Sequence, residues 1–295
     1  METVERALSL YGAPVYVRKQ IVHNLHVVRE LEGRGAIFVD NEQEVPVGAT
    51  VVLSAHGVAP SVYANAAERG LNTIDATCPL VTKVHVQARR YAADGHTVVL
   101  IGHAGHEEVV GTMGEAPDAT VLVQSVAEAE ALQLPDGAPV AYITQTTLSV
   151  DETSEIVDAL KRRFPQIRGP QREDICYATS NRQWAVKELL DEVDLLLVIG
   201  SRNSSNSNRL VEVARAAGTP SFLIDDETEI DDRWLEGADT VGITSGASAP
   251  EQLVTRVCDW FRAYGVDDIS AYSSVYEDVV FRLPVELRRA ETPAA

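Results

Sequence analysis

The sequence predicts an α/β fold of three similar modules, each a parallel sheet with helices on both faces, arranged around a central cavity. Short apolar runs typical of buried strands alternate with segments of helical periodicity along nearly the whole chain. Several of these strands stop abruptly in a cluster of His, Ser, Thr, Asn, Gly or Cys. Ligands of open α/β sheets bind outside the carboxyl ends of the strands, so we expect these polar ends to line one cavity.

The first module is expected at residues 1–78. Residues 1–10 have the apolar spacing of an amphipathic helix, and two further helices are expected to end at glycines. The expected strands are short apolar runs within residues 13–17, 35–39, 50–57 and 73–79, and the two further helices lie within residues 24–35 and 61–70.

The second module is expected at residues 79–175 and the third at residues 176–264, with the same order of strand, loop and helix. A final segment, residues 265–295, is expected to hold one strand at 276–284 and a tail. The expected strands of the second and third modules lie at 97–102, 119–123, 139–144, 195–201, 220–225 and 238–246, and the main helices at 80–95, 150–164, 182–193, 207–218 and 251–265.

Charge and composition narrow the classes of function. The formal net charge is −19 and the isoelectric point is about 4.7, which argues against nucleic acid because phosphate backbones bind clustered Lys and Arg. No apolar run approaches the roughly 20 residues that span a bilayer, so no membrane segment is expected. Three widely spaced cysteines do not form a disulfide framework, and they indicate a reducing, cytoplasmic compartment.

Two of the cysteines have parallel contexts. Cys78 in DATCPL and Cys176 in DICYAT each follow an acidic residue in an apolar-to-polar turn, and each precedes a helix. A helix N-terminus stabilises a thiolate, which suits a metal or iron–sulfur ligand; the alternative is a small buried residue. Cys258 shares a helix face with Val254 and Phe261, so packing is favoured there.

Histidines and hydroxyls stand at other strand ends. GHAGHEEVVG holds His106 and Glu108, which could deliver a proton to a leaving hydroxyl, ligate a metal or cap the following helix. His23 and His56 lie where a strand gives way to a turn or helix, where a structural hydrogen bond is the alternative to phosphate binding. SRNSSNSN (201–208) holds more small polar residues than one N-cap requires, and it favours a nest for a phosphate group.

Taken together, these strings resemble the 4-hydroxy-3-methylbut-2-enyl diphosphate reductase family. The similarity is collinear from about residue 11 to residue 260, and it is most specific in DATCPLVTKVH, IGHAGHEEVVGTMG, TQTTLSVDET, DICYATSNRQ and GSRNSSNSNRL. The resemblance implies a cytoplasmic oxidoreductase of the non-mevalonate isoprenoid pathway. It also implies a 4Fe–4S cluster, an allylic diphosphate substrate and a ferredoxin or flavodoxin as electron donor.

The resemblance also implies roles for individual residues. Cys78 and Cys176 would be two of the three cluster ligands, Glu108 would lie on the path of proton delivery, and Thr146 would approach the substrate hydroxyl. Catalysis would involve Glu108, Thr146 and His106. The diphosphate pocket would be lined by His23, His56, His106, Thr146, Ser204, Ser205, Asn206 and Ser248.

One feature departs from the family pattern. The family carries its first cluster cysteine in a G-[FY]-C-A-G-V-like turn before the opening helix, whereas no cysteine precedes Cys78 here. We expect an in-frame cysteine codon shortly upstream of Met1, omitted by the choice of start site or by truncation. The alternatives are a diphosphate-binding protein without cluster or redox activity, and a zinc-dependent hydrolase that uses Cys78, Cys176 and a histidine.

Overall fold

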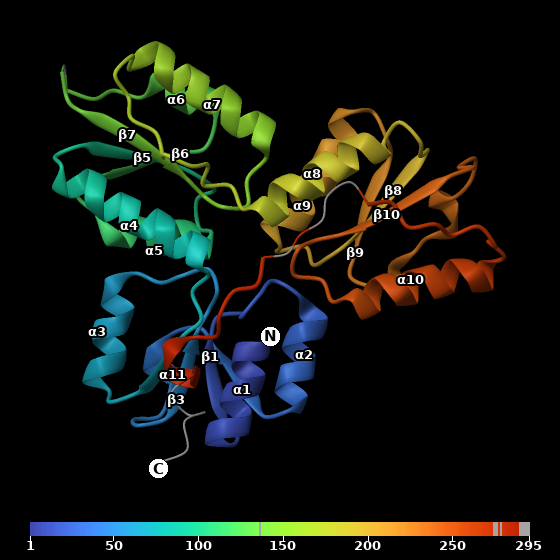
Figure 1. Ribbon diagram of the computed structural model, residues 1–295, viewed down its shortest axis with the longest axis horizontal. Helices are drawn as coiled ribbons and strands as arrows, with labels where there is room; N and C mark the ends of the chain where they lie inside the picture. Colours follow the sequence, from blue (N-terminus) through green and yellow to red (C-terminus); the bar gives the residue numbers. More distant parts are fainter. Residues whose placement is uncertain (136, 274–276, 278, 289–295) are drawn as a thin grey trace. The chain divides into compact units, whose positions relative to one another are not determined.

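The computed structural model describes residues 1–135, 137–273, 277 and 279–288. The chain divides into two compact units: unit 1 comprises residues 1–22, 28–176 and 281–295, and unit 2 comprises residues 23–27 and 177–280. Unit 1 contains two parallel sheets and unit 2 contains one (Figure 1). The three parallel-sheet modules predicted from the alternation of strands and helices are therefore confirmed, and the central cavity stays a prediction. None of the helices in the described part of the chain has the length and apolar character needed to cross a bilayer.

Sheet A of unit 1 has the strand order β2-β1-β3-β4, with every neighbouring pair parallel. Val51 packs beneath Ala66 on one side of β3, and Leu53 packs against Val58 and Val62. Its strands are β1 (Val15–Arg18), β2 (Ala36–Val39), β3 (Thr50–Leu53) and β4 (Asn72–Asp75), and the helices of this region are α1 (Glu2–Tyr11), α2 (Leu25–Gly33), the 3-10 helix η1 (Glu42–Glu44), α3 (Pro60–Glu68) and α11 (Val285–Arg288).

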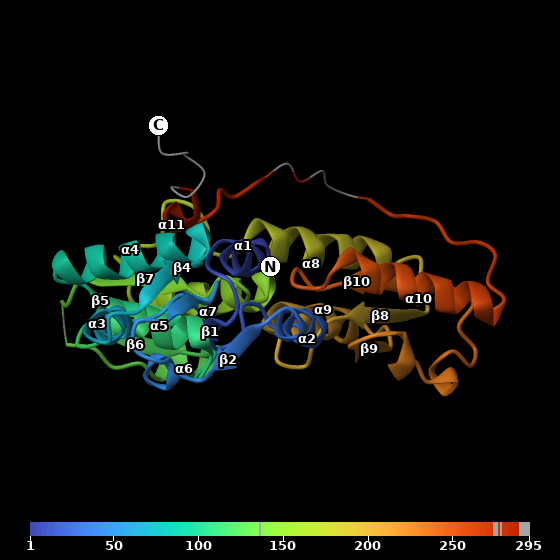
Figure 2. The same cartoon turned by 90° about the horizontal axis from the view of Figure 1, so that it is seen from below.

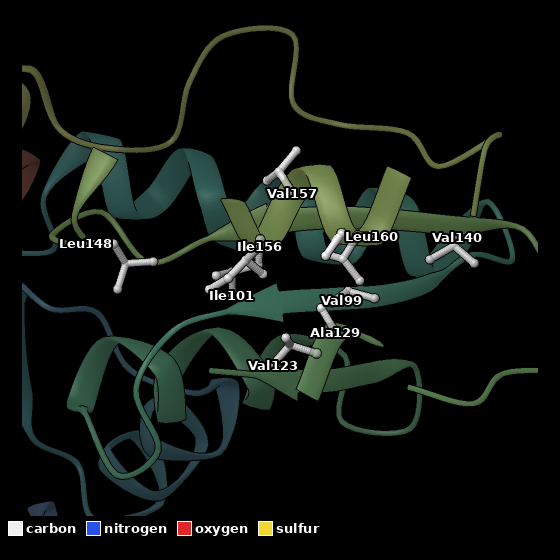
Figure 3. Packing of buried hydrophobic residues seen from close by; sticks show 10 residues of the cluster. Val99, Ile101, Val123, Ala129, Val140, Leu148, Ile156, Val157 and Leu160 are labelled. Atoms are coloured by element: carbon white, nitrogen blue, oxygen red, sulfur yellow. The ribbon is translucent and has the colours of Figure 1, made fainter. Parts of the chain in front are cut away.

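Sheet B of unit 1 has the order β6-β5-β7 and is also parallel. The central strand β5 is buried on both faces: Val99 and Ile101 pack against α6 and α7 (Figure 3), and Val98 and Leu100 pack against α4 and α5. The elements are α4 (Pro79–Ala93), β5 (Thr97–Ile101), α5 (Glu107–Glu115), β6 (Thr120–Val123), α6 (Val126–Ala131), β7 (Val140–Thr144) and α7 (Val150–Arg163).

Sheet C in unit 2 has the order β10-β8-β9. All five residues of β8 are buried, because Leu196 and Val198 pack against α8 and α9 while the alternate residues pack against α10. The elements are α8 (Tyr177–Leu189), β8 (Leu195–Ile199), α9 (Ser205–Ala216), β9 (Ser221–Ile224), the 3-10 helices η2 (Glu227–Glu229) and η3 (Asp232–Trp234), β10 (Val241–Ser245) and α10 (Glu251–Tyr264).

The expected C-terminal strand at 276–284 is the main secondary-structure difference. Residues 276 and 278 lie outside the described residues, and none of the described residues in this stretch is in a strand. Val279 and Val280 are 49% and 89% exposed, so the described residues of this run lack a layer that would bury their apolar side chains. The last described element is instead the short helix α11, which contacts α1 and β4 (Figure 2).

Candidate functional site

The strand orders place a topological switch point in each sheet. In sheet B the chain passes from β5 to β6 on one side and then crosses to β7 on the other, so the switch lies between the carboxyl ends of β5 and β7. In sheet C the same argument selects the ends of β8 and β10, and in sheet A the ends of β1 and β3. The predicted site residues follow these strand ends in the chain.

Glu108 and Thr146 meet at the switch point of sheet B. Glu108 lies in the first turn of α5 and is 2% exposed. The Thr146 backbone N–H donates to Glu108 Oε1 at 2.6 Å, and the Thr146 hydroxyl donates to Oε2 at 2.9 Å. Burial raises the pKa of Glu108 to about 7, against the lowering effect of both Thr146 hydrogen bonds and of His56. This carboxyl group can therefore hold a proton near neutral pH and release it there.

His106 and His56 lie beside this carboxyl group in unit 1. His106 is the N-cap of α5, and its Nδ1 accepts a 3.2 Å hydrogen bond from the Glu108 backbone N–H. Burial, followed by the charge of nearby His56, lowers the pKa of His106 to about 4. His106 is thus neutral at pH 7 and carries its proton on Nε2, where it can donate. The helix-capping alternative for His106 is confirmed, because Nδ1 caps α5.

The turn that carries His56 packs backbone to backbone against α5. The rings of His56 and His106 are 5.8 Å apart and perpendicular, and His56 Nδ1 lies 3.2 Å from a carboxylate oxygen of Glu107. A Cβ atom on Gly111 would lie 3.1 Å from the Gly57 carbonyl oxygen. The lack of a side chain at Gly111 therefore lets α5 lie close to the turn that carries His56.

Cys78 and Cys176 belong to the same unit. Cys78 is the N-cap of α4, and Cys176 directly precedes α8. The Cys176 backbone N–H donates to the Thr146 carbonyl at 2.8 Å, which joins this cysteine to the partner of Glu108. Neither cysteine forms a disulfide among the described residues, and both are half-buried.

The helix N-terminus that was expected to stabilise a Cys78 thiolate is only one of the influences on the pKa of this thiol. The backbone N–H groups of Leu80 and Val81 favour the thiolate, as the sequence predicts. Burial outweighs them, and the negative charges of Cys176 and Glu108 add to it, so the pKa of the Cys78 thiol is raised. Without a bound cation, the surroundings of Cys78 favour the neutral thiol. A bound metal ion would compensate the thiolate for its loss of solvation.

The donor set of unit 1 fits part of an iron–sulfur site. Two half-buried thiols at helix starts, electrostatically coupled to one another, are suitable cluster ligands. Among the described residues, no group of three or more His, Cys, Asp or Glu side chains is placed to hold a metal ion. The zinc alternative, which requires a histidine beside both cysteines, is therefore not supported in this part of the chain. Cys258 is half-buried on α10 of unit 2, next to the core residues Leu253, Val257 and Phe261.

Unit 2 presents a group of neutral donors at the switch point of sheet C. Ser204 is the N-cap of α9, where its hydroxyl oxygen accepts from the Ser207 backbone N–H and from the Ser207 hydroxyl. Asn206 is only 5% exposed, yet neither its side-chain oxygen nor its side-chain nitrogen has a hydrogen-bond partner. A buried amide without partners loses the hydrogen bonds that it would make to water, so this residue is arranged for a ligand rather than for the fold. Ser205 is half-buried at the first position of α9.

His23 and Ser248 join this group through the segment 23–27. The Ser248 hydroxyl donates to the His23 carbonyl at 3.1 Å, and the side chain of Asn203 lies 3.3 Å from His23 Nδ1. The Leu25 backbone N–H donates to the Ser201 hydroxyl, which completes the attachment of the segment to unit 2. The structure thus gathers the predicted site residues into two groups: Cys78, Cys176, His56, His106, Glu108 and Thr146 in unit 1, and His23, Ser204, Ser205, Asn206 and Ser248 in unit 2.

Sequence reasoning missed several residues that support these groups. Lys83 and Asp174 form an ion pair of 3.0 Å close to the cysteines, and Ser207 is wedged between Gly200 and Gly246. Asp174 is the acidic residue that precedes Cys176 in DICYAT, so the sequence drew attention to its position but not to its ion pair. The contacts of Lys83 and Ser207 leave no comparable local pattern.

The raised pKa of Glu108 predicts a specific dependence of stability on pH. Its pKa is about 7 in the folded protein and 4.5 as the ordinary value, so the folded state binds this proton more tightly. The contribution is fully present below pH 4.5 and is lost as the pH rises through 7. At 1.36 kcal/mol per pKa unit, the loss is on the order of 3 kcal/mol. Urea unfolding of the metal-free chain at pH 4.5 and pH 8 should therefore show a smaller decline for Glu108→Gln than for wild type; equal declines would contradict the pKa shift.

Comparisons with known proteins match this chain along nearly its full length. The family model described as LytB protein matches residues 1–262. A 4-hydroxy-3-methylbut-2-enyl diphosphate reductase of Acidothermus cellulolyticus is 61% identical over 290 residues, which cover 98% of this chain and 85% of that protein. One of Burkholderia pseudomallei is 56% identical over 290 residues, covering 98% and 93%.

A solved structure agrees with these matches. The structure of the E-1-hydroxy-2-methyl-but-2-enyl-4-diphosphate reductase from Plasmodium falciparum has a TM-score of 0.93 and 37% identity, and the match covers 98% of this chain and 91% of that one. Family model, relatives and solved structure all point to oxidoreductases of one kind. The chain therefore belongs to the LytB protein family, together with these diphosphate reductases.

Proposed function

We propose that this protein catalyses the reductive dehydration of 4-hydroxy-3-methylbut-2-enyl diphosphate to isopentenyl and dimethylallyl diphosphate. The observation that carries the proposal is the buried Glu108 carboxyl group, which bonds to Thr146 and has a pKa of about 7. Membership of the LytB family supports the choice of substrate. The reducing cytoplasm, inferred from three free cysteines, is the proposed compartment.

The reaction consumes two electrons and two protons for each water released. Glu108 gives a proton to the substrate hydroxyl, the carbon–oxygen bond breaks, and water leaves. A second proton then adds to the allylic carbon, and its position decides which of the two products forms. Thr146 orients the carboxyl group through its two hydrogen bonds and presents its hydroxyl at the same place.

Cys78 and Cys176 are the residues proposed to hold an iron–sulfur cluster. When bound, a 4Fe–4S cluster supplies the two electrons, which we propose come from a ferredoxin or flavodoxin. The two cysteines are half-buried, and the neighbouring Glu108 and Thr146 are 2% and 4% exposed, which limits the access of water to the site of reduction. The first cluster cysteine of the family pattern is not among the residues of this chain.

The unit 2 group is proposed to bind the diphosphate. Ser204 accepts two hydrogen bonds from Ser207, so its own O–H remains as a donor, and the unpartnered Asn206 amide offers two further N–H groups. Backbone N–H groups at the start of α9 add the positive end of the helix dipole. Such donors suit an anionic ligand in a chain with a net charge of −19, which lacks an excess of basic residues.

The direct test is anaerobic reconstitution with iron and sulfide, followed by turnover of the substrate with a strong chemical reductant. Visible absorbance of a cluster and formation of both five-carbon diphosphates, measured by mass spectrometry, are the expected results. The same assay is run on an extended chain, in which an N-terminal segment carrying the first cluster cysteine of the family pattern is added before Met1. Absence of product from both chains would contradict the proposed reaction.

Asn206 also favours a second candidate function, binding of a diphosphate without reduction, because its two unpartnered polar atoms require a ligand and no cluster. Two measurements separate the candidates: pyrophosphate affinity of the chain as it stands, and turnover by this chain and by the extended chain. Affinity for inorganic pyrophosphate together with turnover supports the reductase. The same affinity without turnover in either chain supports the binding protein.

Replacing Asn206 with Ala is expected to weaken pyrophosphate binding by roughly 10- to 100-fold, the effect of losing hydrogen bonds to a charged ligand. The free energy of unfolding without ligand should not fall, because the amide has no partner to lose. Calorimetric titration and urea unfolding measure the two effects. Asn72→Ala, at an exposed position in β4, is the control. A variant that lost stability while keeping its affinity would show a structural role.

A further inference from the structure

Lys83 joins the two segments that carry the candidate cluster cysteines. It lies on α4, the helix that begins directly after Cys78. Its ammonium group donates to the backbone carbonyls of Arg172 and Glu173, both at 2.7 Å, and forms an ion pair with Asp174 at 3.0 Å. The ammonium group is thus held by two main-chain hydrogen bonds and one ion pair.

The groups that Lys83 contacts belong to residues 172–174, the segment that leads into Cys176. The Asp174 side chain is fully buried, and its second oxygen accepts from the Thr144 backbone N–H at 3.1 Å. Two residues later, the Cys176 N–H donates to the Thr146 carbonyl. Residues 172–176 are therefore hydrogen-bonded to the end of β7 on one side and to α4 on the other.

From this arrangement we infer that Lys83 is a positioning residue. By holding the backbone of residues 172–174, it fixes the position of the Cys176 thiol relative to the Cys78 thiol. The inference rests on the proposed function only in taking these thiols as cluster ligands. An ordinary surface lysine would contact solvent or one carboxylate, whereas this one contacts two consecutive main-chain carbonyls and a buried carboxylate. A main-chain attachment transmits position to the next residues more directly than a side-chain pair.

The test uses the metal-free chain and the alkylation rates of its three cysteines, measured on individual peptides by mass spectrometry. In Lys83→Met, Cys176 should react with iodoacetamide at least about tenfold faster, because the segment loses hydrogen bonds to a charged donor. Cys78 and Cys258 should stay within about twofold of wild type. Lys83→Arg, which keeps donors for the carbonyls, should restore most of the protection.

Lys161→Met is the matched control, because Lys161 is an exposed lysine that, among the described residues, pairs with Asp158 one turn away on α7. All three cysteines should react at wild-type rates in this variant. Equal acceleration of all three thiols in Lys83→Met would indicate general loss of structure and would overturn the inference, as would an unchanged rate at Cys176.

A cluster-loaded preparation gives a second readout. A chelator should withdraw iron from Lys83→Met faster than from wild type and from Lys161→Met, and equal rates would count against the positioning role. If neither wild type nor the extended chain takes up a cluster, the proposed function fails, and the alkylation rates still decide the role of Lys83.

Discussion

Glu108→Gln is expected to lower kcat by about 10²- to 10⁴-fold, the usual contribution of a positioned general acid. Glutamine has the shape of glutamic acid and can keep a hydrogen bond to the Thr146 N–H, so the change removes the transferable proton and little else. In wild type the carboxyl group is protonated below its pKa of about 7, so kcat should be highest on the acid side and fall as the pH rises through 7.

Turnover of the reconstituted enzyme between pH 5.5 and 8.5 measures both effects. Glu155→Gln, at an exposed position on α7, is the control and should retain wild-type activity. Absorbance of the cluster should be the same in all three proteins, which separates loss of proton delivery from loss of the cofactor. Retention of more than a tenth of wild-type kcat in Glu108→Gln would remove this residue from the mechanism.

Gly246→Ala is expected to destabilise unit 2 and to weaken pyrophosphate binding together. A Cβ atom at this position would lie 2.1 Å from the Ser207 hydroxyl oxygen, which is fully buried and bonded to Ser204. Overpacking of this kind typically costs about 1–3 kcal/mol. Ser207 follows Asn206 in the first turn of α9. Its displacement should therefore also disturb the groups proposed to donate hydrogen bonds to the diphosphate.

A double-mutant cycle makes this prediction specific. Ser207→Ala removes the hydroxyl oxygen that meets Gly246, and its Cβ would then be 3.2 Å from the new methyl group, so the double variant should recover much of the lost stability. The same Ser207→Ala change should not rescue Gly200→Ala, where the Ser207 Cβ itself would be only 2.7 Å away. Urea unfolding of the single and double variants measures the couplings, and rescue of both glycine variants alike would contradict this packing.

The elements were predictable because each carries its own local pattern. LLLVI is apolar at every position, and β8 is buried on both faces as that run requires. The strand expected at 276–284 was wrong in its described part, because a strand needs a partner edge and the local pattern contains no information about partners. Glu108 and Thr146 were identified from their sequence motifs. The two direct hydrogen bonds between them are visible only in the folded structure.

Interactions between distant parts of the chain mark the limit of sequence reasoning here. Nothing near Lys83 in the sequence indicates that its ammonium group meets carbonyls about 90 residues later. The raised pKa of Cys78 has the same origin, since it depends on burial and on charges brought in by Cys176 and Glu108. The short-range contribution, the two N–H groups at the start of α4, was predicted correctly but is the smaller one.

The close packing of α5 on the turn after β3 constrains how this protein can evolve. A methyl group on Gly114 would overlap the Ala59 side chain at 2.3 Å, and one on Gly57 would collide with the His85 ring. At these glycine positions, α5 and the turn after β3 pack so closely between sheets A and B that larger residues do not fit. Any substitution that separates these elements would move the imidazoles of His56 and His106 together. We therefore expect natural variation on the outer surfaces of α3 and α5, and almost none where the two helices meet.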